Sequence, residues 1–207
     1  MQAILEMKIN QVFLTQEAFR TIMDCMARPG KIGRLNNPGF SPPWGLTPYS
    51  ALLLLTLLDS ETSFAVLPCQ EEWSGYIKLN TDALENEVSQ AEYILLDGSH
   101  DIPDLLTVNR GELLSPEKGV TLIYQVDTIG AAPLASYTGI TLKGPGIKET
   151  RSVYINGMDA SHWERIKHLN REYPLGVDLF IIARDGSMIG IPRSNHFAWE
   201  VLDSWAM

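Results

Sequence analysis

Short apolar segments of strand type alternate with segments of helix type along most of the 207 residues. The clearest strand is GVDLFIIA at 176–183, a continuous apolar run of the kind that is covered on both faces of a parallel sheet. An Asp-Gly pair at 185–186 separates it from a second apolar run, MIGIP at 188–192, which predicts a hairpin. The alternation as a whole predicts an α/β fold with a mixed, mostly parallel sheet and helices on both faces.

Cap and stop signals set the bounds of the expected helices. Thr15 can cap an amphipathic helix that the Pro-Gly pair at 29–30 ends, and Thr47 precedes an apolar one. Ser161 and Glu164 have the S-x-x-E spacing of a capping box. The helices are expected at 15–28, 49–59, 81–92, 102–109, 161–173 and 197–205.

The expected strands follow the short apolar runs between these helices. They are expected at 31–35, 62–67, 76–80, 92–98, 119–127, 135–144, 176–183 and 188–192. The sequence contains no internal repeat, low-complexity tract or long linker. We therefore expect residues 1–207 to form a single α/β domain, a common size for one core.

The net charge, the apolar runs and the cysteines of the chain limit the kinds of partner and compartment that we expect. The formal net charge is −9, so general nucleic-acid binding and a basic membrane-facing patch are disfavoured. The longest apolar run, at 51–58, is too short to span a bilayer, and residues 1–14 lack the pattern of a signal peptide. Two cysteines without a C-x-x-C pair favour a reducing compartment. We expect a cytoplasmic protein that binds neither nucleic acid nor membrane.

The segment LKGPGIKETR at 142–151 looks like a phosphate-binding loop. Its glycines, Gly144 and Gly146, do not have the spacing of a Walker A or a dinucleotide-binding loop, and Pro145 removes one N–H from any anion cradle. A tight turn after a strand is one interpretation. The other is an anion site whose cations would be Lys143, Lys148 and Arg151.

Four charged or titratable residues outside this loop are further candidates. Asp178 is the only charged residue of its apolar run, and a buried carboxylate is costly unless it pairs with Arg193, Arg151 or a backbone N–H. A structural pair and a site residue are both compatible with that position. Arg28 can complement a helix C-terminus or contact an anion or partner, and His196 lies close to Arg193 in sequence.

The sequence gives little indication of a metal site or of a catalytic nucleophile. No H-x-x-x-H pair exists, and His162, next to the expected cap, should be exposed. Cys25 fits a packed thiol better than a nucleophile. Asp97, Asp101 and Asp104 follow a strand and can be read either as Mg²⁺ ligands or as a solvated loop. We assign no metal site and no catalytic residue.

Four segments in order resemble one known family. They are 19–32 (FRTIMDCMARPGKI), 119–127 (GVTLIYQVD), 140–151 (ITLKGPGIKETR) and 173–196 (YPLGVDLFIIARDGSMIGIPRSNH). Together they are similar to the H component (PhnH) of the bacterial carbon–phosphorus lyase system for phosphonate breakdown. The resemblance covers about 15–196, and no such motif occurs in 36–98.

The resemblance implies a three-layer α/β/α fold similar to the large domain of pyridoxal-phosphate-dependent transferases, without that cofactor. A Schiff-base enzyme would need a lysine and an acid near the ring nitrogen. Lys143 and Asp178 are available, but nothing in the sequence brings them together. We therefore expect no cofactor.

The resemblance also implies a role and partners. Such a chain would join G, I and J components in a core complex. With the L component, the system replaces the adenine of ATP by an alkylphosphonate and forms a ribose 1-phosphonate 5-triphosphate. This chain would be an assembly component, and isolated copies would form homodimers through an apolar surface. The candidate phosphate or partner contacts are Arg28, Gly144, Gly146, Lys148, Arg151, Asp178, Arg193 and His196.

Two other functions remain open at this point. A standalone transferase that binds a phosphorylated cofactor or substrate would use the basic cluster at 143–151. A plain interaction domain without a ligand would use none of these groups.

Overall fold

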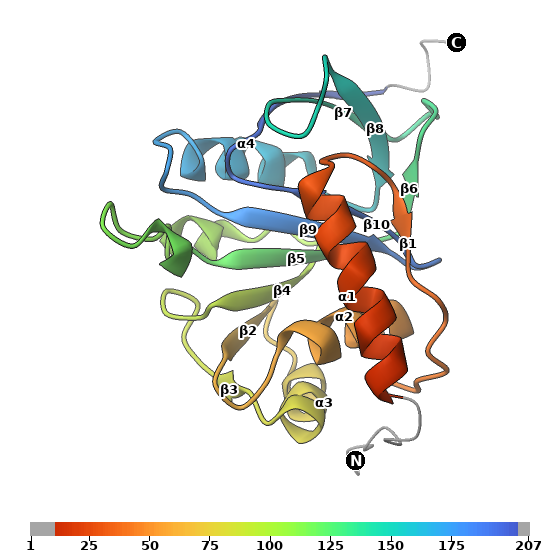
Figure 1. Cartoon of the computed structure of the whole chain (residues 1–207), viewed down its shortest axis with the longest axis vertical. Coiled ribbons are helices and arrows are strands. Elements are labelled where there is room, and N and C mark those ends of the chain that lie inside the picture. The colour runs from red at the N-terminus through yellow and green to blue at the C-terminus, as the bar shows by residue number, and fades with distance from the viewer. Residues whose placement is uncertain (1–10, 203–207) are drawn as a thin grey trace.

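The computed structural model describes residues 11–202, in which helices and strands alternate (Figure 1). The helices are α1 Gln11–Ala27, α2 Pro48–Leu57, α3 Glu71–Thr81 and α4 Ala160–Leu169, with 3₁₀ helices η1 Pro103–Thr107 and η2 Pro116–Lys118. The strands are β1 Gly33–Arg34, β2 Ser63–Leu67, β3 Leu84–Glu85, β4 Tyr93–Asp97, β5 Thr121–Val126, β6 Thr128–Gly130, β7 Thr138–Lys143, β8 Arg151–Asn156, β9 Asp178–Ala183, β10 Ser187–Ile191 and β11 His196–Val201.

The larger sheet has seven strands in the order β1-β10-β9-β5-β4-β2-β3. Strands β2, β3, β4, β5 and β9 run parallel. At one edge, β10 pairs antiparallel with β9, and β1 pairs antiparallel with β10. The expected mixed, mostly parallel sheet is thus confirmed. The Asp-Gly hairpin is also confirmed, because β9 and β10 pair on either side of it.

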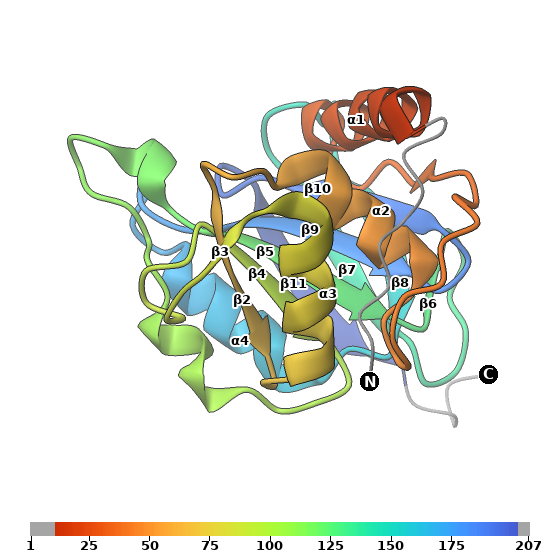
Figure 2. The same ribbon diagram turned by 90° about the horizontal axis from the view of Figure 1, so that it is seen from below.

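Each face of this sheet has its own apolar core. Helices α1, α2 and α3 cover one face, where Leu53, Trp73 and Phe64 are buried. The other face meets α4, from which Trp163 points inward, and a second sheet in the order β11-β7-β8-β6, from which Ile140 points inward. Figure 2 shows α4 on the opposite side of the large sheet from α1 and α2. The second covering layer therefore contains an antiparallel sheet as well as a helix.

Two elements in the middle of the chain differ from expectation. Residues 76–80, expected as a strand, belong to α3. Trp73, Tyr76 and Ile77 are spaced at three and four, and burial of all three against the core stabilises the helix. The helix expected at 81–92 was wrong, because Asp82 adopts a left-handed conformation that ends α3 and the short β3 follows.

The last expected helix, at 197–205, was also wrong within the described residues. Residues 196–201 form β11, and 203–205 lie outside the described part of the chain. Phe197 and Trp199 are half-buried and alternate with exposed neighbours, which is the period of a strand. Phe197 packs edge-on against Trp163 of α4, with 5.5 Å between the ring centroids.

The helix caps were predicted with mixed success. Thr47 caps α2 as expected, since its hydroxyl accepts a hydrogen bond of 3.0 Å from the Ser50 N–H. Thr15 lies inside α1, so it does not cap that helix. Asp159, and not Ser161, caps α4, because its carboxylate accepts from the Ser161 N–H at 2.8 Å. Across residues 11–202, no helix has the length and apolarity needed to cross a membrane.

Candidate functional site

The Gly-Pro-Gly segment after β7 forms a tight turn that rests on the end of α1. The Ile147 N–H closes the turn on the Gly144 carbonyl at 3.1 Å, and Gly146 has a φ of 81°. A Cβ at Gly146 would lie 2.6 Å from the Ala27 carbonyl oxygen and 2.7 Å from Pro29 Cδ. Glycine is therefore required there both for backbone conformation and for close packing.

The Arg-Pro-Gly segment at the end of α1 interlocks with the same turn. Gly30 has a φ of 71°, and a Cβ there would lie 2.6 Å from Leu142 Cδ1. The Arg151 guanidinium donates to the Arg28 carbonyl at 3.4 Å and to the Pro29 carbonyl at 3.3 Å. Arg151 thus joins two segments that lie more than a hundred residues apart in the sequence.

Asn195 brings the third motif, PRSNH at 192–196, to this junction. Its Nδ2 donates to the Pro145 carbonyl at 3.1 Å. Its Oδ1 is buried and has no hydrogen-bond partner among the described residues. Segments 28–30, 142–151 and 192–196 therefore meet at one place, which we call the motif junction.

Arg193 is fully engaged within the protein. Its Nη2 and Nε lie 2.6 and 3.1 Å from Asp178 Oδ2, and its backbone N–H donates to Asp178 Oδ1 at 2.8 Å. The guanidinium also donates to the carbonyls of Pro116 and Gly119, at 2.6 and 3.2 Å. The structural pair for Asp178 is thus confirmed, and Arg193 has little capacity left for an anion.

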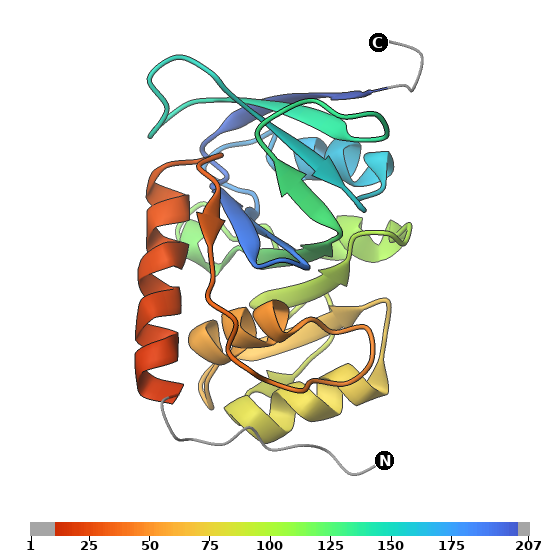
Figure 3. The same cartoon turned by 90° about the vertical axis from the view of Figure 1, so that its right-hand side faces the viewer.

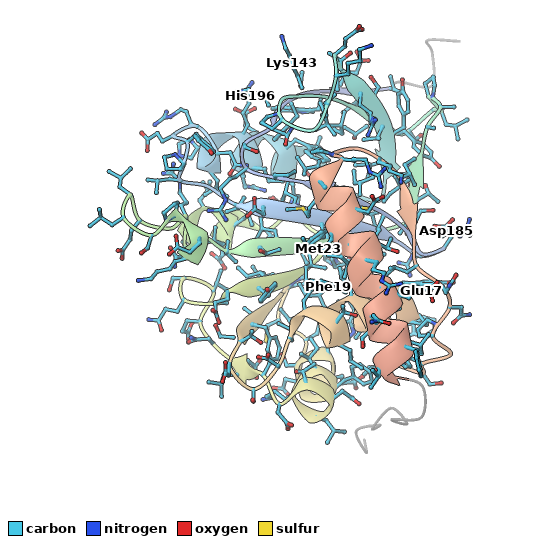
Figure 4. All side chains as sticks on the ribbon, viewed as in Figure 1. Glu17, Phe19, Met23, Lys143, Asp185 and His196 are labelled. Carbon is cyan, nitrogen blue, oxygen red and sulfur yellow. The ribbon has the colours of Figure 1, made fainter. Side chains whose placement is uncertain are left out.

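The basic groups that face outward at the motif junction are a different set. Arg28, Lys143, Lys148 and His196 are all exposed. Lys143 and His196 are opposite each other in the β7–β11 ladder, and Figure 4 shows both side chains at the same end of the molecule. Arg28 forms an ion pair with Asp24. This surface can attract an anion or an acidic partner, but it offers no activated nucleophile.

Two open depressions flank the junction. One, of about 380 Å³, lies beside Asp178 and Arg193 and is also lined by Glu117, Tyr173 and Pro174. The other, of about 520 Å³, lies along α1, where Arg20, Asp24, Lys31 and Arg34 are among its lining residues. Figure 3 shows α1, whose residues line part of this second depression, running lengthwise along one side of the molecule.

One outward face of α1 carries apolar side chains. Phe19 and Met23 are 48% and 52% exposed (Figure 4), although their three- and four-residue spacing to Ile22 and Met26 is typical of a single apolar helix face. Ile22 is buried and Met26 is half-buried. The apolar stripe of α1 is wider than the face that the sheet covers.

His162 was wrongly expected to be exposed and is fully buried. Its Nδ1 lies 2.8 Å from the Tyr124 hydroxyl, and its Nε2 lies 2.7 Å from the His100 carbonyl oxygen. Burial lowers the pKa of His162 below its usual value. Sequence reasoning missed this pair, because nothing in the spacing relates residue 124 to residue 162.

Two of the acidic residues at or just after the end of β4 are hydrogen-bonded to other groups of the protein. Asp101 is bound by Arg165 at 2.6 Å and by the Ser161 hydroxyl at 3.2 Å, and the Arg165 contact holds the Asp101 pKa below its usual value. Asp97 accepts from the Ser99 hydroxyl at 2.7 Å. Within residues 11–202, no group of three or more His, Cys, Asp or Glu side chains is placed to hold a metal ion.

Comparison with known proteins agrees with the four segments. The chain is 28% identical over 195 residues to "Putative C-P lyase subunit protein HtxG" of Stutzerimonas stutzeri, covering 91% of this chain and 88% of that protein. It is also 28% identical over 195 residues to "Alpha-D-ribose 1-methylphosphonate 5-triphosphate synthase subunit PhnH" of Rhizobium meliloti (strain 1021), with 92% and 94% covered. The model of the family described as "Bacterial phosphonate metabolism protein (PhnH)" matches residues 8–198. The chain therefore belongs to the PhnH family of bacterial phosphonate metabolism proteins.

Proposed function

We propose that this chain is an assembly subunit of a carbon–phosphorus lyase core complex for phosphonate degradation. There it would support the formation of a ribose 1-phosphonate 5-triphosphate from ATP and an alkylphosphonate, together with G, I and J components. The names of the two relatives, both called subunits, support this role. The chain would be part of an enzyme without being catalytic alone.

The proposal rests on which side chains of the family motifs are bonded inside the chain and which are exposed. The Arg193 guanidinium binds Asp178 and two backbone carbonyls inside the chain, and Nη1 of Arg151 donates to two further carbonyls. The side chains that the motif junction exposes form a basic surface. This surface contains no nucleophile paired with a base. Such a surface suits an acidic partner subunit, because charge complementarity steers and orients association.

A charge-reversal experiment tests this surface. In a strain that needs the complex for growth on an alkylphosphonate, Lys148→Glu should reduce growth and weaken co-purification of the other components. Lys118→Glu is the matched control, because Lys118 is equally exposed but lies on η2. If growth and co-purification are the same for both variants and the unaltered chain, the motif junction is not part of the surface that binds a partner.

We further propose that the chain works without pyridoxal phosphate. Asp178, the acid considered for the ring nitrogen, is held by Arg193, and Lys143 is exposed at the end of β7. A relation of the seven-stranded sheet to the large domain of pyridoxal-phosphate-dependent transferases is part of this proposal, supported by its mixed strand directions. Addition of pyridoxal phosphate should produce no imine absorbance band.

The second candidate function is a standalone transferase for a phosphorylated substrate, which the exposed Lys143, Lys148 and His196 favour. An imine band that disappears in Lys143→Ala would support that function. We also propose that the protein is cytoplasmic. The free thiols of buried Cys25 and exposed Cys69 support this location, because free thiols are usual in a reducing compartment.

A further inference from the structure

The depression of about 520 Å³ along α1 lies between that helix and the segment 31–34, which contains β1. The two elements lie side by side (Figure 1). A Cβ at Gly33 would lie 2.6 Å from Cys25 Sγ and 2.9 Å from Thr21 Cγ2. Glycine at 33 therefore allows α1 and β1 to pack closely where both line the depression.

Cationic side chains line this depression from both elements. Arg20 comes from α1, and Lys31 and Arg34 come from the segment beside it. Arg28 forms an ion pair with Asp24, a further lining residue. Because an α-helix rises about 1.5 Å per residue, Arg20 and Arg28 are about 12 Å apart along α1. The cations are therefore spread along an elongated site.

The carboxylates at the depression neutralise only part of this charge. Asp24 is paired with both Arg28 and Lys31, and one carboxylate cannot neutralise two cations. Arg34 lies 3.4 Å from Asp185, in a pair whose side chains are 70% and 52% exposed. Solvent weakens the attraction in such an exposed pair. Lys31 and Arg34 thus keep much of their capacity to bind an anion.

Arg20 is exposed and forms no ion pair or hydrogen bond within residues 11–202. Glu17, the carboxylate before it on α1, binds the Asn36 amide at 2.9 Å and lines a separate, smaller cavity. The four cations and two carboxylates at the depression leave an excess of positive charge on a chain whose net charge is −9. A depression lined by one sign of charge raises the local concentration of ions of the opposite sign.

Asp24 orders part of the site before any ligand arrives. Its Oδ2 lies 2.7 Å from Lys31 Nζ, and its side chain is only 29% exposed. Long cationic side chains lose rotamer freedom when they bind a ligand, so side chains that are already held bind at a lower entropic cost. Asp24 is therefore a positioning residue for Lys31 and Arg28.

We propose that this depression binds a polyphosphate group, the chemistry that inorganic polyphosphate shares with the phosphate chain of a nucleotide. The planar guanidinium groups of Arg20 and Arg34 match pairs of phosphate oxygens, and Lys31 adds a compact charge. An elongated polyanion can contact cations along the whole site, whereas a single orthophosphate can contact only some of them. The volume lies in the range of about 300–1,000 Å³ that is usual for small-molecule sites.

An acidic peptide fits the depression less well than a polyphosphate does. Ile32 is its one large apolar lining residue in the described part of the chain. A peptide would find few apolar contacts for its side chains there, and buried apolar anchors supply most of the binding energy in protein interfaces. The charged groups of the depression instead match a ligand that consists almost entirely of anionic oxygens.

Isothermal titration calorimetry on the whole chain, without divalent cations, tests this site. One sodium tripolyphosphate should bind per chain, and Arg20→Gln should raise the Kd about tenfold through loss of a charge-assisted contact. Glutamine keeps the helix propensity of arginine, so this variant should fold. Arg171→Gln, at an exposed arginine outside the depression, should leave the Kd unchanged. No tripolyphosphate binding, or equal affinity in Arg20→Gln and the unaltered chain, would overturn the proposal.

Other ligands and one further variant define what the site recognises. Orthophosphate should bind at least tenfold more weakly than tripolyphosphate, and equal affinities would contradict an elongated site. ATP that binds more tightly than tripolyphosphate would assign the site to nucleotides, and weaker binding of ATP would assign it to inorganic polyphosphate. If Lys148→Gln loses the affinity and Arg20→Gln retains it, the ligand binds at the motif junction and the proposal is wrong.

Lysine acetylation, followed by mass spectrometry, gives a readout that needs no variant. Lys31 and Lys78 are a matched pair, because each lies 2.7 Å from one carboxylate and their side chains are 43% and 50% exposed. Lys78 belongs to α3, outside the depression. Saturating tripolyphosphate should slow acetylation of Lys31 several-fold and leave Lys78 unaffected. Equal slowing of both, or of neither, would contradict the site.

This inference does not depend on the proposed function, because both experiments use the isolated chain. A chain that joins the other phosphonate components but does not bind tripolyphosphate would refute the site and leave the function intact. A chain that binds tripolyphosphate at Arg20 but never joins those components would refute the function and leave the site intact.

Discussion

Arg193 binds Asp178 through both its side chain and its backbone, and the shortest contact, from Nη2 to Oδ2, is 2.6 Å. The pair connects the end of β10 to the start of β9. Through the Pro116 and Gly119 carbonyls it also fixes the segment before β5. Two residues that the sequence offered as site candidates thus hold three segments of the fold together.

Loss of this pair should destabilise the fold strongly. Arg193→Ala leaves a largely buried carboxylate and two carbonyls without their donor, so the free energy of unfolding should fall by about 3 kcal/mol. Urea denaturation measures this. Arg184→Ala is the control, because its pair with Asp127 is exposed and should be worth less than about 1 kcal/mol. Similar losses in both variants would contradict the role of the Arg193 clamp.

Stability should fall as the pH drops below the usual pKa of histidine. Burial lowers the pKa of His162 in the folded state, so in this window the unfolded chain binds the proton first and gains from it. The urea midpoint should therefore be lower at about pH 5.5 than near pH 7.5, where the imidazole is neutral in both states. The carboxylates with lowered pKa values, such as Asp101 and Asp159, contribute to losses only at more acidic pH.

A matched pair of variants isolates that histidine. His162→Gln removes the buried imidazole and should flatten the pH dependence, even though it lowers stability at both pH values. His168→Gln changes an exposed histidine on the same helix and should leave the dependence as it was. A steep dependence that persists without His162 would assign the effect to another group.

Gly146→Ala should destabilise the chain much more than Gly39→Ala. Both glycines have positive φ values, 81° and 71°, so both variants carry the same kind of backbone strain. Only at Gly146 would the new Cβ meet backbone, 2.6 Å from the Ala27 carbonyl oxygen, whereas Gly39 has open space. Thermal unfolding should show a clearly larger loss at 146, and equal losses would mean that the turn does not press on α1.

Elements with strong local signals could be predicted from the sequence. The Asp-Gly hairpin, the Thr47 cap and the apolar strand at 178–183 were all found, because turn chemistry and burial act within a few residues. The pairing of Asp178 with Arg193 was one of three options that the sequence left open. Asp178 pairs with Arg193 because β9 and β10 are neighbours in the sheet, and the predicted hairpin already implied that these strands are neighbours.

The errors arose where tertiary contacts decide the structure. The apolar and polar residues of segment 76–80 alternate in part, which led to the prediction of a strand. The packing of Trp73 and Ile77 against the core makes the segment helical. In β11, helix-favouring residues such as Glu200 obscured the alternation of Phe197 and Trp199. The motif junction could not be foreseen, because no local signal places Gly146 against Ala27 or Asn195 against Pro145.

The most direct test of the proposed function is co-expression of this tagged chain with the G, I and J components of its phosphonate system, followed by purification and native mass spectrometry. We predict a stable complex that contains this chain in a fixed stoichiometry, and formation of the ribose 1-phosphonate 5-triphosphate, with the L component added, only when it is present. A chain that purifies alone, while the remaining components form the product at the full rate without it, would contradict the account.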